Sequence, residues 1–193
     1  SMSVPYLTEE EIPKYCNIID GVTVGDVAIA TDLIDSYLGR SYAPQTFKDR
    51  VRISKRGRGK LSRPPIVDVK SVKAIIETPF GASKIDVDID NIELDPEMDG
   101  YFTFEGEFGL TSYIYRVIPK LLIVEYVSGF SEFPTRLKTA CAMLASNIRQ
   151  AMSFNGAKQL TSLDFQVMMT DDSFFTSDIK RLLKGFKYNV RSV

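Results

Sequence analysis

The sequence predicts an α+β fold in which helical segments enclose a central block of antiparallel strands. Apolar residues recur at helical spacing near residues 24–38, 134–153 and 176–184, whereas apolar and polar residues alternate across much of 45–131. We therefore predict a single domain over residues 1–193. Its helical core comprises 1–44 and 132–193, and a β insertion occupies 45–131.

The helix predicted at 24–38 has a start signal and a stop signal. Thr23 and Asp26 have the spacing of a capping box, and Gly39 supplies a residue suited to the left-handed conformation that ends helices. Apolar residues follow one stripe of this helix. Asp32 and Asp35 lie off that stripe, so we expect both carboxylates to face solvent.

The central block has the period of strands. In "FKDRVRI", Phe47 and Val51 fall on one side of the alternation, and Lys48, Arg50 and Arg52 fall on the other. Prolines and glycines mark turns between further alternating segments. About five or six short antiparallel strands fit this stretch, arranged as a small sandwich or a curled sheet.

Helical period returns after Pro134. The segment 134–153 has one continuous apolar stripe, and its alanines and serines predict close packing against another helix. The segment "SLDFQVMM", at 162–169, alternates and is predicted to form a strand. A last short helix is expected at 176–184, with Ser177 as its cap.

The composition restricts the function. The 193 residues include 24 Lys and Arg against 25 Asp and Glu, which gives a net charge of −1, and there is no histidine. The lack of histidine excludes Ser–His–Asp and Cys–His catalysis and His-ligated zinc sites. Cys16 and Cys141 show no metal-binding or redox spacing and are expected to be free thiols. No apolar run is long enough for a membrane helix. We predict no enzyme activity, no cofactor and no membrane association.

A basic run extends from Arg50 to Pro65 and reads "RVRISKRGRGKLSRPP". It lacks a phosphate-binding loop motif, and no aromatic residue within it offers a stacking surface for bases. Three interpretations remain open: a solvated loop, a contact with an acidic protein surface, and a contact with the DNA backbone. The candidate basic patch consists of Arg50, Arg52, Lys55, Arg56, Arg58, Lys60 and Arg63.

An acidic run, "DVDIDNIELDPEMDG", extends from Asp86 to Gly100. The candidate acidic patch consists of Asp86, Asp88, Asp90, Glu93, Asp95, Glu97 and Asp99. Asp86, Asp88, Asp90 and Glu97 match the ligand spacing of a calcium loop, but Glu93 and Pro96 depart from the pattern. A strand with Val87 and Ile89 turned inward explains the run more simply, so we predict no metal site.

Several segments, taken in order, resemble the head–tail connector (adaptor) proteins of tailed phages and prophages. The first is "VTVGDVAIATDLIDSYLGRSY", which is similar to the first long helix of that family and its close. The second is the strand "PPIVDVKSV". The third is "VEYVSGFSEFPTRLKTACAMLA", a strand that leads into a helix begun by proline. The fourth comprises "GAKQLTSLDF" and "DIKRLLKGF". The acidic run has no counterpart that we can match in the family.

The resemblance implies a structural protein of the virion neck that is assembled in the bacterial host cytoplasm. Such proteins form a ring of about a dozen copies beneath the portal, can be monomeric in solution, extend the DNA channel and present a surface to tail-side completion or terminator proteins. The implied partners are therefore the portal protein, tail proteins, other copies of the chain and, nonspecifically, the DNA backbone. One basic and one acidic patch on each subunit would supply the two faces of a ring contact.

Two other classes of function remain open at this point. One is a different phage binding module without catalysis, such as a tail completion or baseplate protein. The other is a histidine-free enzyme or a nucleic-acid binder, for which the balanced net charge gives little support.

Overall fold

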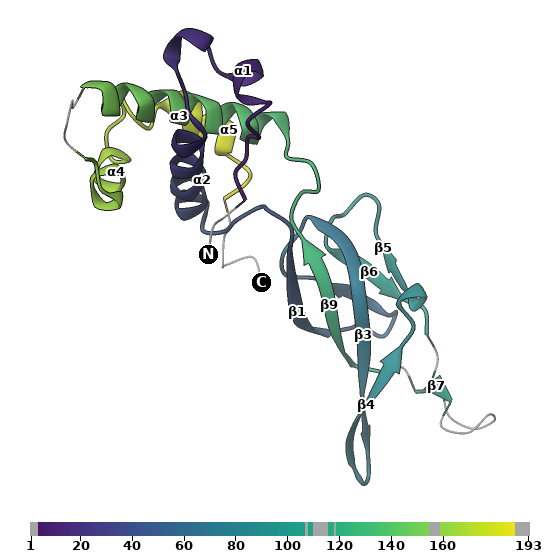
Figure 1. The fold of residues 1–193 in the computed structure, drawn as a ribbon. Coiled ribbons are helices and arrows are strands. Elements are labelled where there is room, and N and C mark those ends of the chain that lie inside the picture. Colours follow the sequence, from purple (N-terminus) through teal and green to yellow (C-terminus); the bar gives the residue numbers. More distant parts are fainter. Residues whose placement is uncertain (1–3, 107, 110–115, 118, 155–158, 188–193) are drawn as a thin grey trace. The chain divides into compact units, whose positions relative to one another are not determined.

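The computed structural model describes residues 4–106, 108–109, 116–117, 119–154 and 159–187 (Figure 1). The chain divides into two compact units. The helical unit comprises residues 1–43 and 132–193, and the β unit comprises residues 44–131. That these units act together as one connector-like domain stays a prediction.

The helical unit is organised around one long helix, α3, against which α2 and α5 pack (Figure 1). The helix predicted at 24–38 is confirmed, and those predicted at 134–153 and 176–184 are confirmed to within one residue at each end. The helical elements are α1 (Ile12–Tyr15), η1 (Ile18–Asp20), α2 (Val24–Leu38), α3 (Thr135–Phe154), α4 (Ser162–Met168) and α5 (Ser177–Leu183).

The start and end of α2 follow its local sequence. Thr23 accepts a hydrogen bond from the Asp26 N–H, and the Asp26 carboxylate accepts one from the Thr23 N–H, which completes the predicted capping box. Gly39 ends the helix with a φ of 81°. On α3, small residues such as Ala140 and Ala145 are fully buried, and α3 packs against other helices, as predicted.

Three predictions in the helical unit are wrong. The segment 162–169 is the helix α4, because Thr161 and Asp164 form a capping box that favours a helical turn. Thr176, not Ser177, caps α5. Asp35 is half-buried and bonded to Tyr6, whereas Asp32 is exposed as expected.

The β unit contains two antiparallel sheets and one two-stranded ribbon. The four-stranded sheet has the order β1-β9-β3-β4, the three-stranded sheet has the order β2-β6-β5, and the ribbon pairs β7 with β8. Gln45 of β1 is the register partner of Ser128 of β9. The strands are β1 (Gln45–Arg52), β2 (Arg58–Lys60), β3 (Ile66–Thr78), β4 (Gly81–Val87), β5 (Ile92–Leu94), β6 (Tyr101–Phe104), β7 (Phe108–Gly109), β8 (Arg116–Val117) and β9 (Leu121–Ser128).

The two larger sheets share one core, so the β unit is a small sandwich. Val51 and Leu122 from the four-stranded sheet belong to the same buried cluster as Phe102 and Phe104 from β6. At Gly59 of β2 an added Cβ would lie 2.5 Å from the Phe102 ring. These contacts confirm the α+β class and its antiparallel block. The described strands outnumber the five or six predicted because β2, β5, β7 and β8 span only two or three residues each.

Other sequence predictions concern single features. Cys16 and Cys141 are free thiols. Across the described residues, none of the helices has both the length and the apolar content needed to span a bilayer.

Candidate functional site

The cations of the basic run lie on different faces of the sandwich. Arg50 and Arg52 alternate with buried Val51 on β1, so they point away from the core on the outer face of the four-stranded sheet. Arg58 and Lys60 flank buried Gly59 on β2 and lie on the outer face of the other sheet. Lys55, Arg56 and Arg63 lie in the segments before and after β2, and the Arg63 guanidinium lies 4.5 Å from the centre of the Phe47 ring.

The acidic run lies beside part of the basic run in the same chain. In the three-stranded sheet, Arg58 of β2 and Glu93 of β5 are both register partners of Thr103 on the central strand β6. Arg58 also forms an ion pair with Asp95 at 3.2 Å. The sheet therefore has two cations on one edge strand and Glu93 on the other, and the Arg58–Asp95 ion pair links β2 to the loop that follows β5.

Backbone hydrogen bonds hold the carboxylates at the end of the acidic run. Asp95 accepts from the N–H groups of Glu97 and Met98, and these bonds, with Arg58 nearby, lower the pKa of Asp95 below its ordinary value. Asp99 accepts from the Ile66 N–H at 3.2 Å, which fixes the start of β3. These two carboxylates therefore shape the loop that precedes β6.

The four residues with calcium-loop spacing occupy separate positions. Asp86 is on β4 and forms a long ion pair with Lys73 at 3.9 Å. Asp88 caps the short 3-10 helix η2 (Ile89–Asn91) by accepting from the Asp90 N–H. Glu97 follows in the next loop. Among the described residues, no group of three or more potential ligands is placed to hold a metal ion.

The turn before β2, within the basic run, depends on Gly57. Its φ is 78°, and an added Cβ would lie 2.4 Å from the Phe104 carbonyl oxygen. The Phe104 N–H donates to the Gly57 carbonyl at 2.7 Å. Only glycine fits this approach without moving β6 away from the turn.

We expect Gly57→Ala to lower the free energy of unfolding of the β unit by about 2 kcal/mol or more, since backbone strain adds to a backbone clash. Urea unfolding followed by far-UV circular dichroism measures the change. Gly21→Ala is the matched control, because Gly21 has a φ of 67° but open space around the Cβ position. Equal losses in the two variants would contradict the proposed clash.

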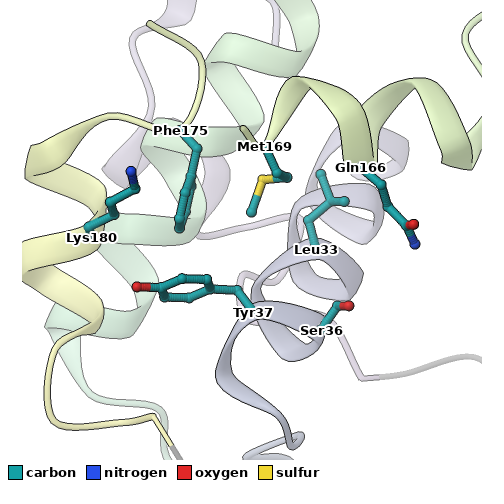
Figure 2. A pocket seen from close by; sticks show the side chains of 7 residues that line it. All are labelled: Leu33, Ser36, Tyr37, Gln166, Met169, Phe175 and Lys180. Carbon is teal, nitrogen blue, oxygen red and sulfur yellow. The ribbon is translucent and has the colours of Figure 1, made fainter. Parts of the chain in front are cut away.

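The helical unit has a hollow of about 410 Å³ between α2, α4 and α5. Figure 2 shows Tyr37 below the Phe175 ring, Met169 and Leu33 beside it, and Lys180 and Gln166 at opposite ends. The Tyr37 and Phe175 rings meet edge to face at 4.8 Å, and Lys180 is paired with Asp172 at 3.2 Å. The lining therefore suits apolar contact rather than proton transfer. Its residues are Leu33, Ser36, Tyr37, Gln166, Met169, Phe175 and Lys180.

A buried polar network at the end of α2 was not predicted from the sequence. The Tyr6 hydroxyl donates to the Asp35 carboxylate and accepts from the Tyr42 N–H at 3.1 Å. Burial raises the pKa of Asp35 to about 6, although hydrogen bonds from Tyr6 and Ser41 oppose the shift. The network joins the N-terminal segment to the loop that follows α2.

The stability of the helical unit is expected to fall as the pH rises through about 6. The pKa of Asp35 is raised in the folded protein, so its contribution to stability is fully present below the ordinary carboxyl pKa of 3.8 and is lost above about 6. Asp35→Asn should remove this fall in urea titrations at a series of pH values. Asp32→Asn is the control, and its curve should keep most of the slope, because burial is the first cause of the Asp35 shift.

No protein-family model matches the chain, and no curated protein matches it. Solved structures contain similar chains. One is in the neck of an empty gene transfer agent (GTA) particle computed with C6 symmetry, with 17% identity over 94% of this chain and 92% of that chain and a TM-score of 0.46. Another is in the neck of the native GTA particle computed with C12 symmetry, with 16% identity, coverage of 94% and 92%, and a TM-score of 0.45. A third is in the virion of the native GTA particle, with 16% identity, coverage of 93% and 91%, and a TM-score of 0.45. Identities and TM-scores of this size do not decide a function.

The segments that carry the sequence resemblance contact one another in the folded chain. At the close of the first segment, the Arg40 guanidinium lies 4.3 Å from the centre of the Tyr42 ring. That ring meets Phe186 of the last segment at 5.7 Å, and the Tyr42 hydroxyl donates to the Phe186 carbonyl. In the β unit, the Gly129 N–H of the third segment donates to Pro65 of the second at 3.0 Å. The third segment continues into α3, against which α2 of the first segment and α5 of the last segment pack, so all four segments take part in these contacts.

Proposed function

We propose that this chain is a structural component of the neck of a tailed phage or prophage particle. It acts as a head–tail connector that forms a ring of about a dozen copies beneath the portal, joins the DNA-filled head to the tail and extends the DNA channel. Its partners are the portal protein, tail-side completion or terminator proteins, and neighbouring copies. DNA passes through the ring and is contacted only through its backbone.

The observation that carries this proposal is the ordered set of four family-like segments. Each segment is short, but their order spans most of the chain, and their residues contact one another. The Tyr42–Phe186 contact ties the loop that follows α2 to the last segment, and the Pro65–Gly129 bond ties the second segment to the third. Residues that pack against each other are expected to persist together in a family that diverges widely elsewhere.

The charge distribution also suits a structural role. The chain has no histidine and a net charge of −1, so neither proton chemistry nor a strong overall attraction to nucleic acid is favoured. In the three-stranded sheet of the β unit, the exposed cations Arg58 and Lys60 lie on β2 and the exposed carboxylate of Glu93 lies on β5. Such sorting serves contacts between copies, since each subunit of a ring presents two different surfaces.

Purified particles provide the direct test. We expect the chain to be present in them, and a tag on it to be located by electron microscopy at the junction of head and tail. Particles made without the chain should accumulate as DNA-filled heads and separate tails. A label at the tail tip would favour the tail completion or baseplate alternative, and absence from particles would refute both proposals.

A further inference from the structure

The outer face of the four-stranded sheet combines positive charge with a half-exposed apolar strip. Register places Arg50, Ile123, Lys73 and Asp86 in one row across the sheet. The next row is Arg52, Leu121, Ile75 and Lys84. Directly paired residues of antiparallel strands point to the same side, and the intervening residues of these strands are turned toward the core. We call this surface the basic face.

Part of the charge on the basic face is already balanced. Lys48 pairs with Glu125 at 3.6 Å, and Lys73 pairs with Asp86 at 3.9 Å. Arg50, Arg52 and Lys84 are exposed and have no ion-pair partner within the described part of the chain. The basic face therefore offers unbalanced cations around Ile75, Leu121 and Ile123, which are all half-buried.

A second surface, on η2 and β5, has the opposite character. Asp88, Asp90 and Glu93 are exposed, and none of them is in an ion pair with another described residue. Ile89 lies between the first two, in η2, and is 42% exposed, so the prediction that it turns inward on a strand is wrong. Since β5 is an edge strand, neighbouring strands leave this surface uncovered on one side. We call it the acidic edge.

We propose that the basic face binds the acidic edge of a second copy of this chain. The two surfaces match in charge, and each combines its charge with exposed or half-exposed apolar residues. They do not neutralise each other within one chain, since the described ion pairs of the β unit do not join them. The contact is heterologous, because the surface used on one copy differs from that used on the next.

The composition of the basic face favours a protein partner over nucleic acid. Glu125 and Asp86 lie among its cations and would repel a phosphate backbone. Between β1 and β4 the described rows contain isoleucine and leucine, and no aromatic side chain for base stacking. An acidic protein surface with an exposed isoleucine is complementary to both parts of the basic face, because its carboxylates pair with the cations and its isoleucine packs on the apolar strip.

The inference deepens the proposed function by assigning the contact between ring neighbours. It is tested by cross-linking two cysteine variants in a Cys16→Ser background. One chain carries Ile123→Cys on the basic face, and the other, with a tag that changes its mass, carries Ile89→Cys on the acidic edge. We expect the mixed disulfide to form about tenfold faster than in a mixture of Ile123→Cys with Val24→Cys. Added salt should reduce this advantage, since exposed charges are screened.

Charge reversal identifies the surfaces. Adding Arg50→Glu and Arg52→Glu to the first chain should reduce cross-linking to the control rate, as should Asp90→Arg and Glu93→Arg in the second. Mixing the two reversed chains should restore it, which a general loss of folding would not do. Lys55→Glu with Arg56→Glu, in the turn before β2, is the matched control and should leave the rate unchanged.

The inference is overturned if cross-linking never exceeds the Val24→Cys control, or if the reversed chains fail to restore it while their circular dichroism is normal. DNA retention that depends on Arg50 and Arg52, without the cross-link, would assign the basic face to nucleic acid instead. Location of the chain by microscopy of particles is independent of these results. A neck location without the cross-link would refute this contact and leave the proposed function standing.

Discussion

Arg149→Ala is expected to lower the free energy of unfolding of the helical unit by about 3–5 kcal/mol. The Asp26 side chain is 1% exposed, and its two oxygens accept from Arg149 at 2.8 and 2.9 Å. Burial opposes ionisation of Asp26, but hydrogen bonds from Arg149 and the Thr23 N–H hold the pKa of Asp26 below its ordinary value. Without Arg149, a buried carboxylate at the start of α2 loses its partner on α3.

Amide hydrogen exchange within α3, with urea unfolding at neutral pH, measures this loss. The double variant Asp26→Asn, Arg149→Met removes both charges and should recover a large part of the stability. Lys180→Ala is a control, since its partner Asp172 is 90% exposed. The effect of Arg149→Ala should diminish in acid, because a group with a lowered folded pKa contributes above its unfolded pKa and loses this contribution as the pH falls. A loss no larger than that of Lys180→Ala would contradict the role of the buried pair.

Phe102→Ala is expected to destabilise the β unit by about 3–5 kcal/mol, since it leaves a cavity at the centre of the sandwich. Phe102 is 1% exposed and lies on β6, the central strand of the three-stranded sheet. Its ring packs against Gly59 of β2. Gly59 has no side chain that could move into the cavity, and the cavity could close only if the β2 backbone moved.

Hydrogen exchange of the β2, β5 and β6 amides should rise in Phe102→Ala before that of the helical unit. Tyr101→Ala is the matched control, because Tyr101 is the adjacent residue on the same strand but is half-exposed on the outer face. A similar loss in both variants would show that the effect arises from the strand rather than from the core.

Local signals predicted most of the secondary structure. The capping box and Gly39 specify α2 within a few residues, and Pro134 stands just before α3. The prediction failed at α4, because it rested on an apolar alternation of a few residues and did not consider the Thr161–Asp164 capping box. In a short amphipathic segment the two periods overlap, so the cap is the better indicator.

Local sequence patterns did not predict the contacts between residues that are distant in the sequence. The sequence displayed the basic and acidic runs, but the Arg58–Asp95 pair depends on the order of β2, β6 and β5. Strand register also separates Arg50 and Arg52 from Arg58 and Lys60 onto different faces. The burial of Asp35 depends on Tyr6, which reaches α2 from a segment with no periodicity. The order of the strands and the packing of the N-terminal segment determine where these side chains lie, and the spacing of residues along the sequence does not reveal either.

The pairing of Gln45 with Ser128 has a consequence for how such a chain can change through evolution. The first strand of the β unit begins beside the end of its last strand, so the two ends of this inserted segment lie next to each other. Changes in the length or sequence of the inserted segment can therefore leave the short distance between its two ends unaltered. Recombination between related genomes can therefore supply new surface strands to an unchanged helical scaffold, and the charge pattern of the β unit can diversify independently of the helices that carry it.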